Sequence, residues 1–274
     1  MGENRDAIPE EIRREVRRSC GFGCAICGLP IYDYDHIIEY SEVKEHKFEN
    51  LVLLCPNHHR SKNKTIPLSE IQKAKNDPIN LRTGTTLPEM INFRGNKIDV
   101  FIGSNHYSKV FDNIRNETYP LVIDNVPVIS FRKDMDKILL SITIYNSSNE
   151  PLLIIEDNEM IMSTIVWDIT YIGNTLRIDS NEVSQVIVIH FDVNRSVISL
   201  QRANYSFNNW HITIDSKGEV LCTSPEKMRG FSGVSGGNNP NASSGFVIID
   251  YSSNTGFLIG EGDLNKYKPL VKFG

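Results

Sequence analysis

Four side chains in the N-terminal part of the chain have the types and the spacing of a metal site. Cys24 and Cys27 form a C-x-x-C pair, and Cys55 and His58, at the same spacing, follow after 27 intervening residues. Two ligands three positions apart can face one tetrahedral ion, and a second pair closes its coordination shell. Because four sulfur and nitrogen ligands leave no position for water, the pattern predicts a structural zinc site.

Two features leave this ligand set open. Cys20 stands four residues before Cys24, so this pair is an alternative half-site. His58 and His59 are adjacent, and because a helix turns by about 100° per residue they cannot easily share one ion. The two-residue gap after Cys55 assigns His58 to zinc. The competing interpretation is a set of buried free cysteines beside unrelated histidines.

The distribution of cysteines along the chain also predicts the cellular compartment of the protein. Four of the five cysteines lie within the first 55 residues, and the fifth is Cys222. A secreted disulfide scaffold spreads an even number of cysteines through the fold, so clustering beside histidines predicts metal binding in a reducing compartment, the cytoplasm. The polar N-terminus has no apolar signal segment, and no run approaches the roughly 18 apolar residues of a membrane helix.

Further polar residues follow one another between and after the half-sites. Asp35-His36 comes first, then Asn50-Leu51, then the run LCPNHH at residues 54–59. In this order and spacing, residues 20–64 resemble the HNH endonuclease family, whose motif reads D-H, N-L and L-C-x-x-C-H-x-x-K. His58 stands where the family more often has a cysteine. The resemblance implies a zinc-stapled ββα-metal module that hydrolyses DNA phosphodiester bonds with one divalent metal.

The resemblance also implies a role for each residue of the motif. His36 stands at the position of the general base, and an imidazole with a pKa near neutrality suits that task. Asp35 and His59 stand at the positions that hold the catalytic metal, Mg²⁺ or Mn²⁺. Asn50 stands at the position whose side chain braces the loop of the catalytic histidine. Asn63, four residues after His59, would share its helix face and is an additional candidate ligand.

Net charge does not mark this module as a binder of nucleic acid. Residues 1–80 hold 12 Lys and Arg against 13 Asp and Glu, and residues 81–274 hold 17 against 21. Proteins that contact many phosphates usually present a basic face, so such a face must be local here. Two clusters could provide it: Arg13, Arg14, Arg17 and Arg18, and then the phosphate-binding candidates Arg60, Lys62 and Lys64. A solvated helix face is the alternative for at least two residues of the second cluster.

The pattern of apolar and capping residues predicts the elements that must position these side chains. A polar loop at residues 41–49 contains His46, which we expect to be exposed and without function. The expected helices are 9–19, one that starts near Pro56 and continues to residue 64, and 68–75, and the expected strands are 35–39 and 51–54.

The rest of the chain reads as strands. Short runs rich in Ile, Val, Leu, Thr and Tyr recur about every ten residues, separated by turn residues, which predicts an all-β sandwich or barrel. The expected fold class is therefore α+β. The expected organisation is a nuclease module with an N-terminal helix at 1–78, a linker at 79–96, an all-β domain at 97–223, a flexible Gly/Ser/Asn-rich segment at 224–246 and a terminal strand pair at 247–274.

These expectations combine into one functional hypothesis and its alternatives. The first hypothesis is a metal-dependent DNA endonuclease, in restriction or anti-phage defence, whose β-rich half selects the target, binds a small-molecule or protein activator, or forms a homo-oligomer. One alternative is a non-catalytic zinc-knuckle binding protein. Another is an RNA nuclease or a nickase with the same site. The joint presence of Asp35, His36, Asn50 and His59 favours the nuclease over the non-catalytic protein, while the sequence does not exclude RNA as the substrate.

Overall fold

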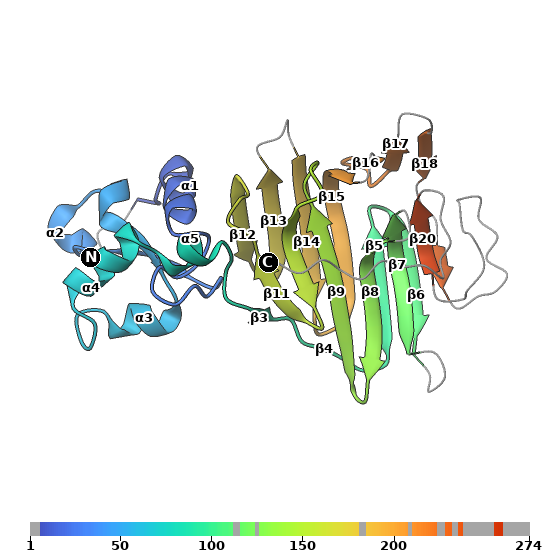
Figure 1. The fold of residues 1–274 in the computed structure, drawn as a ribbon, viewed down its shortest axis with the longest axis horizontal. Helices are drawn as coiled ribbons and strands as arrows, with labels where there is room; N and C mark the ends of the chain where they lie inside the picture. The colour runs from blue at the N-terminus through green and yellow to red at the C-terminus, as the bar shows by residue number, and fades with distance from the viewer. Residues whose placement is uncertain are drawn as a thin grey trace. The chain divides into compact units, whose positions relative to one another are not determined.

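A computed structural model of the protein describes residues 6–111, 116–123, 126–180, 185–207, 210–223, 228–231, 235–237 and 255–259. The chain divides into two compact units. The first comprises Met1–Glu89 and Met162–Ile169, and the second comprises Met90–Ile161 and Thr170–Gly274. Helices gather in the first unit and strands in the second, so the predicted α+β class is confirmed (Figure 1).

The first unit is built from short helices around a two-stranded sheet. Its elements are α1 (Glu10–Ser19), β1 (Asp33–His36), α2 (Tyr40–Val43), the 3₁₀ helix η1 (Phe48–Asn50), β2 (Leu51–Leu54), α3 (Pro56–Ser61), α4 (Leu68–Asn76) and α5 (Ile79–Thr83). The helices expected at 9–19 and 68–75 and the strand at 51–54 are confirmed. The strand expected at 35–39 lies earlier in the chain, and the loop at 41–49 is partly helical.

The helix expected to continue to residue 64 ends at Ser61. Lys62 already has an extended backbone, with φ −55° and ψ 137°, and Asn63 is left-handed at φ 59°. The Lys62 side chain is buried against Asp35, a contact that the helical pattern of the sequence could not reveal. The sequence-based prediction of this helix end is therefore wrong by one turn.

Strand β2 forms the centre of the first unit. All four of its residues are buried, and it pairs antiparallel with β1 so that Asp35 lies opposite Val52 and His36 opposite Leu51. Val16 of α1 and Ile71 of α4 pack in the same core and are fully buried. An apolar strand covered on both faces in this way fixes the position of β1, and hence of the Asp35-His36 pair.

A buried ion pair fixes α1 within the same unit. The Arg17 guanidinium donates two hydrogen bonds to the Asp168 carboxylate, at 2.7 and 2.5 Å, and also bonds Tyr34 and Glu10. The Arg17 and Asp168 side chains are only 3% and 6% exposed. Arg17 is therefore no part of a basic surface, which corrects the expectation from the arginine cluster.

Replacing Arg17 by methionine is expected to destabilise the first unit by about 3–5 kcal/mol, because the Asp168 carboxylate would remain buried without its main partner. The double variant Arg17→Met/Asp168→Leu should recover most of this loss, since an apolar pair carries no desolvation cost. Urea unfolding followed through Trp167, in a Trp210→Phe background, measures both. Equal midpoints for wild type and the single variant would contradict the assignment.

The second unit contains two sheets. Its first sheet has the strand order β20-β7-β8-β9-β10-β11-β3, with β4 on β9, and its second has the order β12-β13-β14-β15-β16-β17-β18, with β5, β6 and β19 joined through β15. Their bounds are β3 (Glu89–Met90), β4 (Phe93–Arg94), β5 (Lys97–Ile102), β6 (Asn105–Val110), β7 (Glu117–Ile123), β8 (Val126–Asp134), β9 (Lys137–Tyr145), β10 (Pro151–Glu156), β11 (Glu159–Met162), β12 (Asp168–Ile172), β13 (Thr175–Ser180), β14 (Gln185–Asp192), β15 (Val197–Phe207), β16 (Trp210–Ile214), β17 (Val220–Thr223), β18 (Met228–Phe231), β19 (Ser235–Gly237) and β20 (Thr255–Ile259).

The two sheets pack against each other as a sandwich, which is one of the two architectures expected. Tyr145 on β9 stacks on Phe207 on β15, with ring centroids 4.5 Å apart. The backbone N–H of Tyr145 also donates to the Tyr205 hydroxyl at 3.3 Å. Alternating buried residues on both sheets supply the interior, as in β9 of the first sheet and β16 of the second. Trp210 is 7% exposed and packs in this unit.

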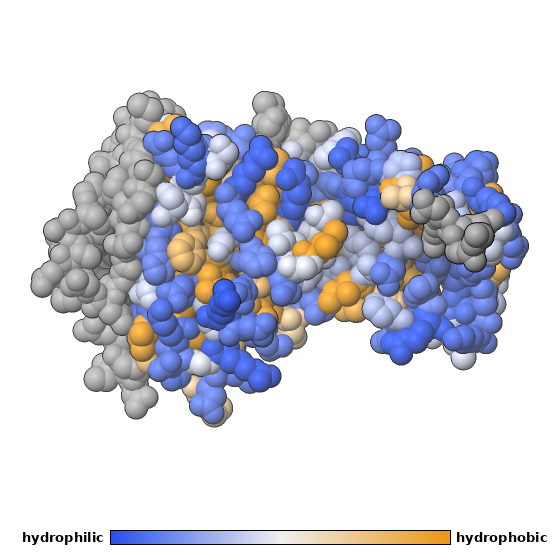
Figure 2. Space-filling model, turned by 180° about the vertical axis from the view of Figure 1, so that it is seen from behind, coloured by the Kyte–Doolittle hydropathy of each residue, from blue (hydrophilic) through white to orange (hydrophobic). Residues whose placement is uncertain are grey.

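Three segments of the expected organisation either differ from the structure or lie largely outside its described residues. Residues 79–96, expected as a linker, carry α5, β3 and β4. The flexible segment expected at 224–246 and the strand pair expected at 247–274 lie largely outside the described residues. Among the described helices, each is too short or too polar to cross a membrane. Figure 2 shows one face of the molecule, where hydrophilic residues cover most of the described surface and hydrophobic ones lie between them.

Candidate active site

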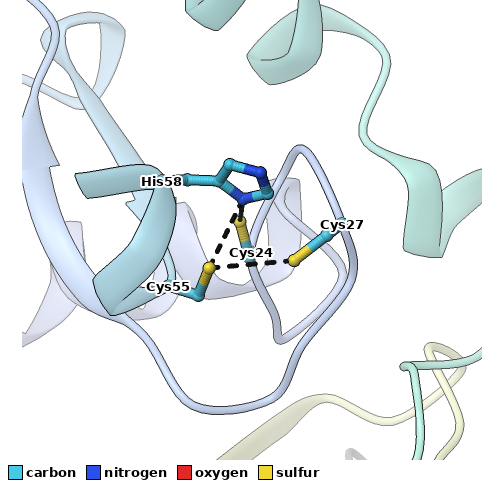
Figure 3. Close-up of side chains that lie close together, drawn as sticks. All are labelled: Cys24, Cys27, Cys55 and His58. Atoms are coloured by element: carbon cyan, nitrogen blue, oxygen red, sulfur yellow. Dashed lines mark hydrogen bonds between the residues drawn. The ribbon is translucent and has the colours of Figure 1, made fainter. Parts of the chain in front are cut away.

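The predicted zinc ligands converge on one point. The Nδ1 atom of His58 lies 3.2 Å from the sulfur of Cys24 and 3.3 Å from that of Cys55, and the sulfurs of Cys27 and Cys55 are 3.8 Å apart. Figure 3 shows the His58 ring directed at the three sulfurs. All four ligand atoms lie within 4.8 Å of one another. Cys20 is outside this group, and its sulfur lies 3.9 Å from the Ser19 hydroxyl instead.

The backbone holds the two half-sites in position. The turn after Cys24 closes through hydrogen bonds from Gly28 N–H to the Cys24 carbonyl and from Cys24 N–H to the Leu29 carbonyl. Gly28 has φ +84°, and a Cβ at this position would collide with the Asn80 side chain. Glycine is required there because side chains rarely adopt this conformation. The second half-site begins α3, where Cys55 is the N-cap and Pro56 the first helical residue.

The geometry and the chemistry of the four donors fit Zn²⁺. An ion about 2.3 Å from two thiolates in a tetrahedral arrangement separates them by about 3.8 Å, the distance found between Cys27 and Cys55. Hydrogen bonding from Cys27 lowers the pKa of Cys24, while the pKa of Cys27 is raised, because one proton is shared between the two thiols. Because metal binding requires thiolates, a soft cation held by this group would take the place of the shared proton.

A second group of polar side chains lies on the other side of α3. His59 Nε2 is 3.8 Å from Asp35 Oδ1, so His59 is directed at Asp35 while its neighbour His58 is directed at the thiols. The other carboxylate oxygen, Asp35 Oδ2, is buried and has no hydrogen-bond partner among the described residues. Burial also raises the pKa of Asp35, although the nearby Lys62 ammonium opposes this shift.

These two residues fit a divalent cation. Oxygen and nitrogen donors about 2.1 Å from one ion are separated by about 3–4 Å, which the Asp35–His59 distance matches. An unpartnered buried carboxylate oxygen is costly, and a cation is the partner that would satisfy it best. Asp35 and His59 could therefore hold Mg²⁺ or Mn²⁺, with water completing the shell.

Lys62 and Glu39 also belong to this group, although the sequence did not assign them to it. The Lys62 ammonium lies 3.1 Å from Asp35 Oδ1 and 3.0 Å from Glu39 Oε1, and it also bonds the backbone carbonyl of His36. The Lys62 side chain is only 4% exposed, whereas Arg60 and Lys64 are exposed. Lys62 therefore lies inside the module, which corrects both the expectation that it contacts a flanking phosphate and the alternative of a solvated helix face.

Asn50 and the additional candidate ligand Asn63 make different contacts. Asn50 braces the chain after His36: its amide donates to the Ile38 carbonyl at 2.9 Å and its carbonyl accepts from Ile38 N–H at 2.8 Å. Asn63 lies beyond the end of α3 and its amide reaches Glu39 Oε1 at 3.4 Å. The expectation that Asn63 shares a helix face with His59 is therefore wrong, because the helix ends at Ser61.

His36 itself is buried, with 3% of its surface exposed, and contacts His46 from the loop before η1. His46 is half-buried, which corrects the expectation that it is exposed. Ten residues separate the two histidines, and no periodicity in the sequence connects them. The contact arises because the chain reverses at Lys44, after α2, and brings His46 onto the Tyr40 ring.

Comparison with known proteins gives one match. No curated protein and no solved structure matches the chain. Residues 24–65, which contain both half-sites and the residues around Asp35, match the family model described as HNH endonuclease.

Proposed function

We propose that the chain is an HNH-type endonuclease that hydrolyses phosphodiester bonds in DNA. The observation that carries the proposal is the pair formed by Asp35 and His59, whose donor atoms lie 3.8 Å apart beside an unpartnered, buried carboxylate oxygen. The residue next to Asp35 is a histidine, the side chain best suited to accept a proton near neutral pH. A zinc-binding group on the opposite side of α3 would hold this arrangement rigid.

The proposed reaction assigns one task to each residue. His36 accepts a proton from the attacking water, whose oxygen forms a bond to phosphorus as the bond from phosphorus to the leaving 3′ oxygen breaks. The departing oxygen takes a proton from solvent. Asp35 and His59 bind and orient a divalent cation, which when bound neutralises charge on the phosphate oxygens. Asn50 holds the backbone after His36, and Arg60 and Lys64, which are exposed, could contact flanking phosphates.

The β-rich half belongs to the same proposal in a different role. Its composition is acidic, with 17 Lys and Arg against 21 Asp and Glu over residues 81–274, which does not favour a broad DNA-binding face. We propose that it selects the target or releases the activity, through a small-molecule or protein activator or through self-association. Restriction or anti-phage defence in the cytoplasm is the setting we propose for such a nuclease.

Replacing Asp35 by asparagine tests the metal site directly. We expect the variant to bind Mn²⁺ more than about 100-fold more weakly, because even a contact that only supports a metal ligand is worth about 10- to 100-fold. Asp33→Asn is the matched control, since Asp33 lies on the same strand and is exposed. Titration with Mn²⁺, followed by the electron paramagnetic resonance signal of the free ion, measures the affinities.

Cleavage assays on the same proteins test the proposed activity. Wild type and Asp33→Asn should cut supercoiled plasmid in Mg²⁺ or Mn²⁺, whereas Asp35→Asn should not. Cleavage of single-stranded RNA in place of plasmid would support the RNA nuclease, and a product that stops at the nicked circle would support the nickase. Equal Mn²⁺ affinity for Asp35→Asn and wild type would overturn the metal site.

A further inference from the structure

His46 is the nearest imidazole to His36 and belongs to the same cluster of rings. Its Nδ1 atom lies 3.1 Å from Nε2 of His36, and the ring centroids are 5.1 Å apart. His46 also stacks on Tyr40, with centroids 4.8 Å apart and an interplanar angle of 22°. Tyr40 in turn contacts His36 edge-on at 5.3 Å. A ring that is stacked on one side and hydrogen-bonded at its edge has little freedom to rotate.

The local backbone explains why His46 reaches this position. Helix α2 ends with Lys44 in the left-handed conformation, at φ 51°, and the Lys44 N–H bonds the carbonyl of Tyr40. This reversal turns the chain back over α2, so that the residue two positions later lies on the Tyr40 ring. The position of His46 is thus set by the backbone, in addition to its own contacts.

The hydrogen bonds of His46 define which ring nitrogens carry protons. Its Nε2 lies 2.8 Å from the backbone carbonyl oxygen of Asp6, which can only accept, so Nε2 must donate. In its neutral form the His46 ring has one N–H, so Nδ1 is then an acceptor. Nε2 of His36, 3.1 Å away, must then be the donor of the bond between the rings. In a neutral His36 ring, Nδ1 then carries the lone pair.

We propose that His46 is a positioning residue for His36, which it holds in one orientation and in the tautomer protonated at Nε2. This inference rests on the proposed function, because it concerns the residue assigned as general base. A base needs its lone pair on a defined nitrogen, and a hydrogen-bond acceptor behind a catalytic imidazole serves that purpose in other hydrolases. His46 performs this task with a neutral acceptor, and the Asp6 carbonyl fixes the acceptor's own tautomer.

Two substitutions of His46 distinguish the effect of losing its hydrogen-bond acceptor from the effect of losing its ring. His46→Phe retains a ring that can stack on Tyr40 but removes the acceptor, whereas His46→Asn loses the ring and can present its side-chain oxygen where Nδ1 now lies. With supercoiled plasmid and Mn²⁺, we expect His46→Phe to lower kcat by about 10- to 100-fold with little change in KM, by analogy with hydrogen-bond partners of metal-binding histidines. We expect His46→Asn to restore kcat to within about tenfold of wild type.

Nitrogen-15 NMR of the ring of His36 gives a readout that does not depend on cleavage. In the wild-type full chain the shifts should show Nε2 protonated and Nδ1 unprotonated. In His46→Phe the two tautomers should mix, so that the two nitrogen shifts move toward each other. A merely structural role for His46 would alter stability without changing this tautomer.

Three results would overturn the inference. One is a His36 tautomer that is identical in wild type and His46→Phe, and another is a wild-type ring protonated at Nδ1. The third is faster cleavage by His46→Phe and His46→Asn alike, which would mean that His46 only covers His36. If the wild-type chain cuts no nucleic acid, the proposed function fails, while the NMR result still decides whether His46 sets the tautomer of His36.

Discussion

Replacing Cys55 by serine is expected to unfold the first unit and to reduce bound zinc well below one ion per chain. Cys55 contributes a thiolate to the zinc-binding group and is also the N-cap of α3, the helix that carries both His58 and His59. Serine is a poor ligand for a borderline-soft cation. Binding of structural zinc contributes roughly 10–16 kcal/mol to the folding of zinc-finger peptides, as much as the whole stability of a typical domain. The small core around β2 cannot offset the stability lost with one zinc ligand.

Zinc analysis of the purified full chain, together with circular dichroism of its helices, measures this effect. Two other cysteines serve as matched controls. Cys222→Ser changes a buried thiol on β17, in the second unit, and Cys20→Ala changes a buried thiol of the first unit outside the ligand group. Both should retain one zinc per chain. Full zinc retention by Cys55→Ser, or zinc loss in Cys20→Ala, would contradict the ligand set.

Replacing His36 by alanine is expected to slow plasmid cleavage by about 100- to 10,000-fold, the usual contribution of a general base. The loss should appear in kcat, because the proton of the attacking water would have no acceptor in the transition state. Binding of Mn²⁺ should change little, since the proposed ligands Asp35 and His59 remain in place. A loss in kcat alone, with Mn²⁺ binding unchanged, would identify His36 as a general base and not as a metal ligand.

His190→Ala is the control for this substitution. His190 lies on β14 in the second unit, where its ring bonds the Thr175 hydroxyl at 2.9 Å, and its removal should leave cleavage unchanged. A His36→Ala variant that folds, binds Mn²⁺ and cuts at the wild-type rate would show that another group accepts the proton. The Mn²⁺ titration and the cleavage assay must therefore be performed on the same preparation.

Short-range patterns account for the part of the site that the sequence predicted. The two half-sites are each defined within four residues, so Cys24, Cys27, Cys55 and His58 could be identified from spacing alone, as could β2 from its run of apolar residues. Capping and dipole preferences likewise predicted α1, with its acidic first turn and basic last turn.

Contacts between distant residues account for the part that the sequence did not predict. Arg17 pairs with Asp168, 151 positions away, so a run of arginines on a helix looked like a solvated or nucleic-acid-binding face. Lys62 turns into the protein because α3 ends early, and His46 reaches His36 because α2 reverses the chain. Each is a polar contact that forms only after the fold brings its partners together, and a periodicity argument carries no such information.

The same distinction applies to the β-rich unit. Alternation of apolar and polar residues located most of its strands, because each strand reports its own buried face. The pairing does not follow from the alternation: β15 pairs in parallel with β5, about a hundred residues earlier, and in antiparallel with its neighbours β14 and β16. The alternation is therefore compatible with both a sandwich and a barrel. The stacking of Tyr145 on Phe207 shows that the two sheets pack as a sandwich.

Cleavage of supercoiled plasmid by the purified full chain decides whether this module is a metal-dependent nuclease. Parallel reactions contain Mg²⁺, Mn²⁺ or excess EDTA, and zinc is determined before and after the reaction. We expect nicked and linear DNA with either divalent ion and none with EDTA, in samples whose zinc content is the same before and after the reaction. Cleavage that continues at the same rate in EDTA, with Asp35→Asn as active as wild type, would contradict the claim that this module cuts phosphodiester bonds through a metal held by Asp35 and His59.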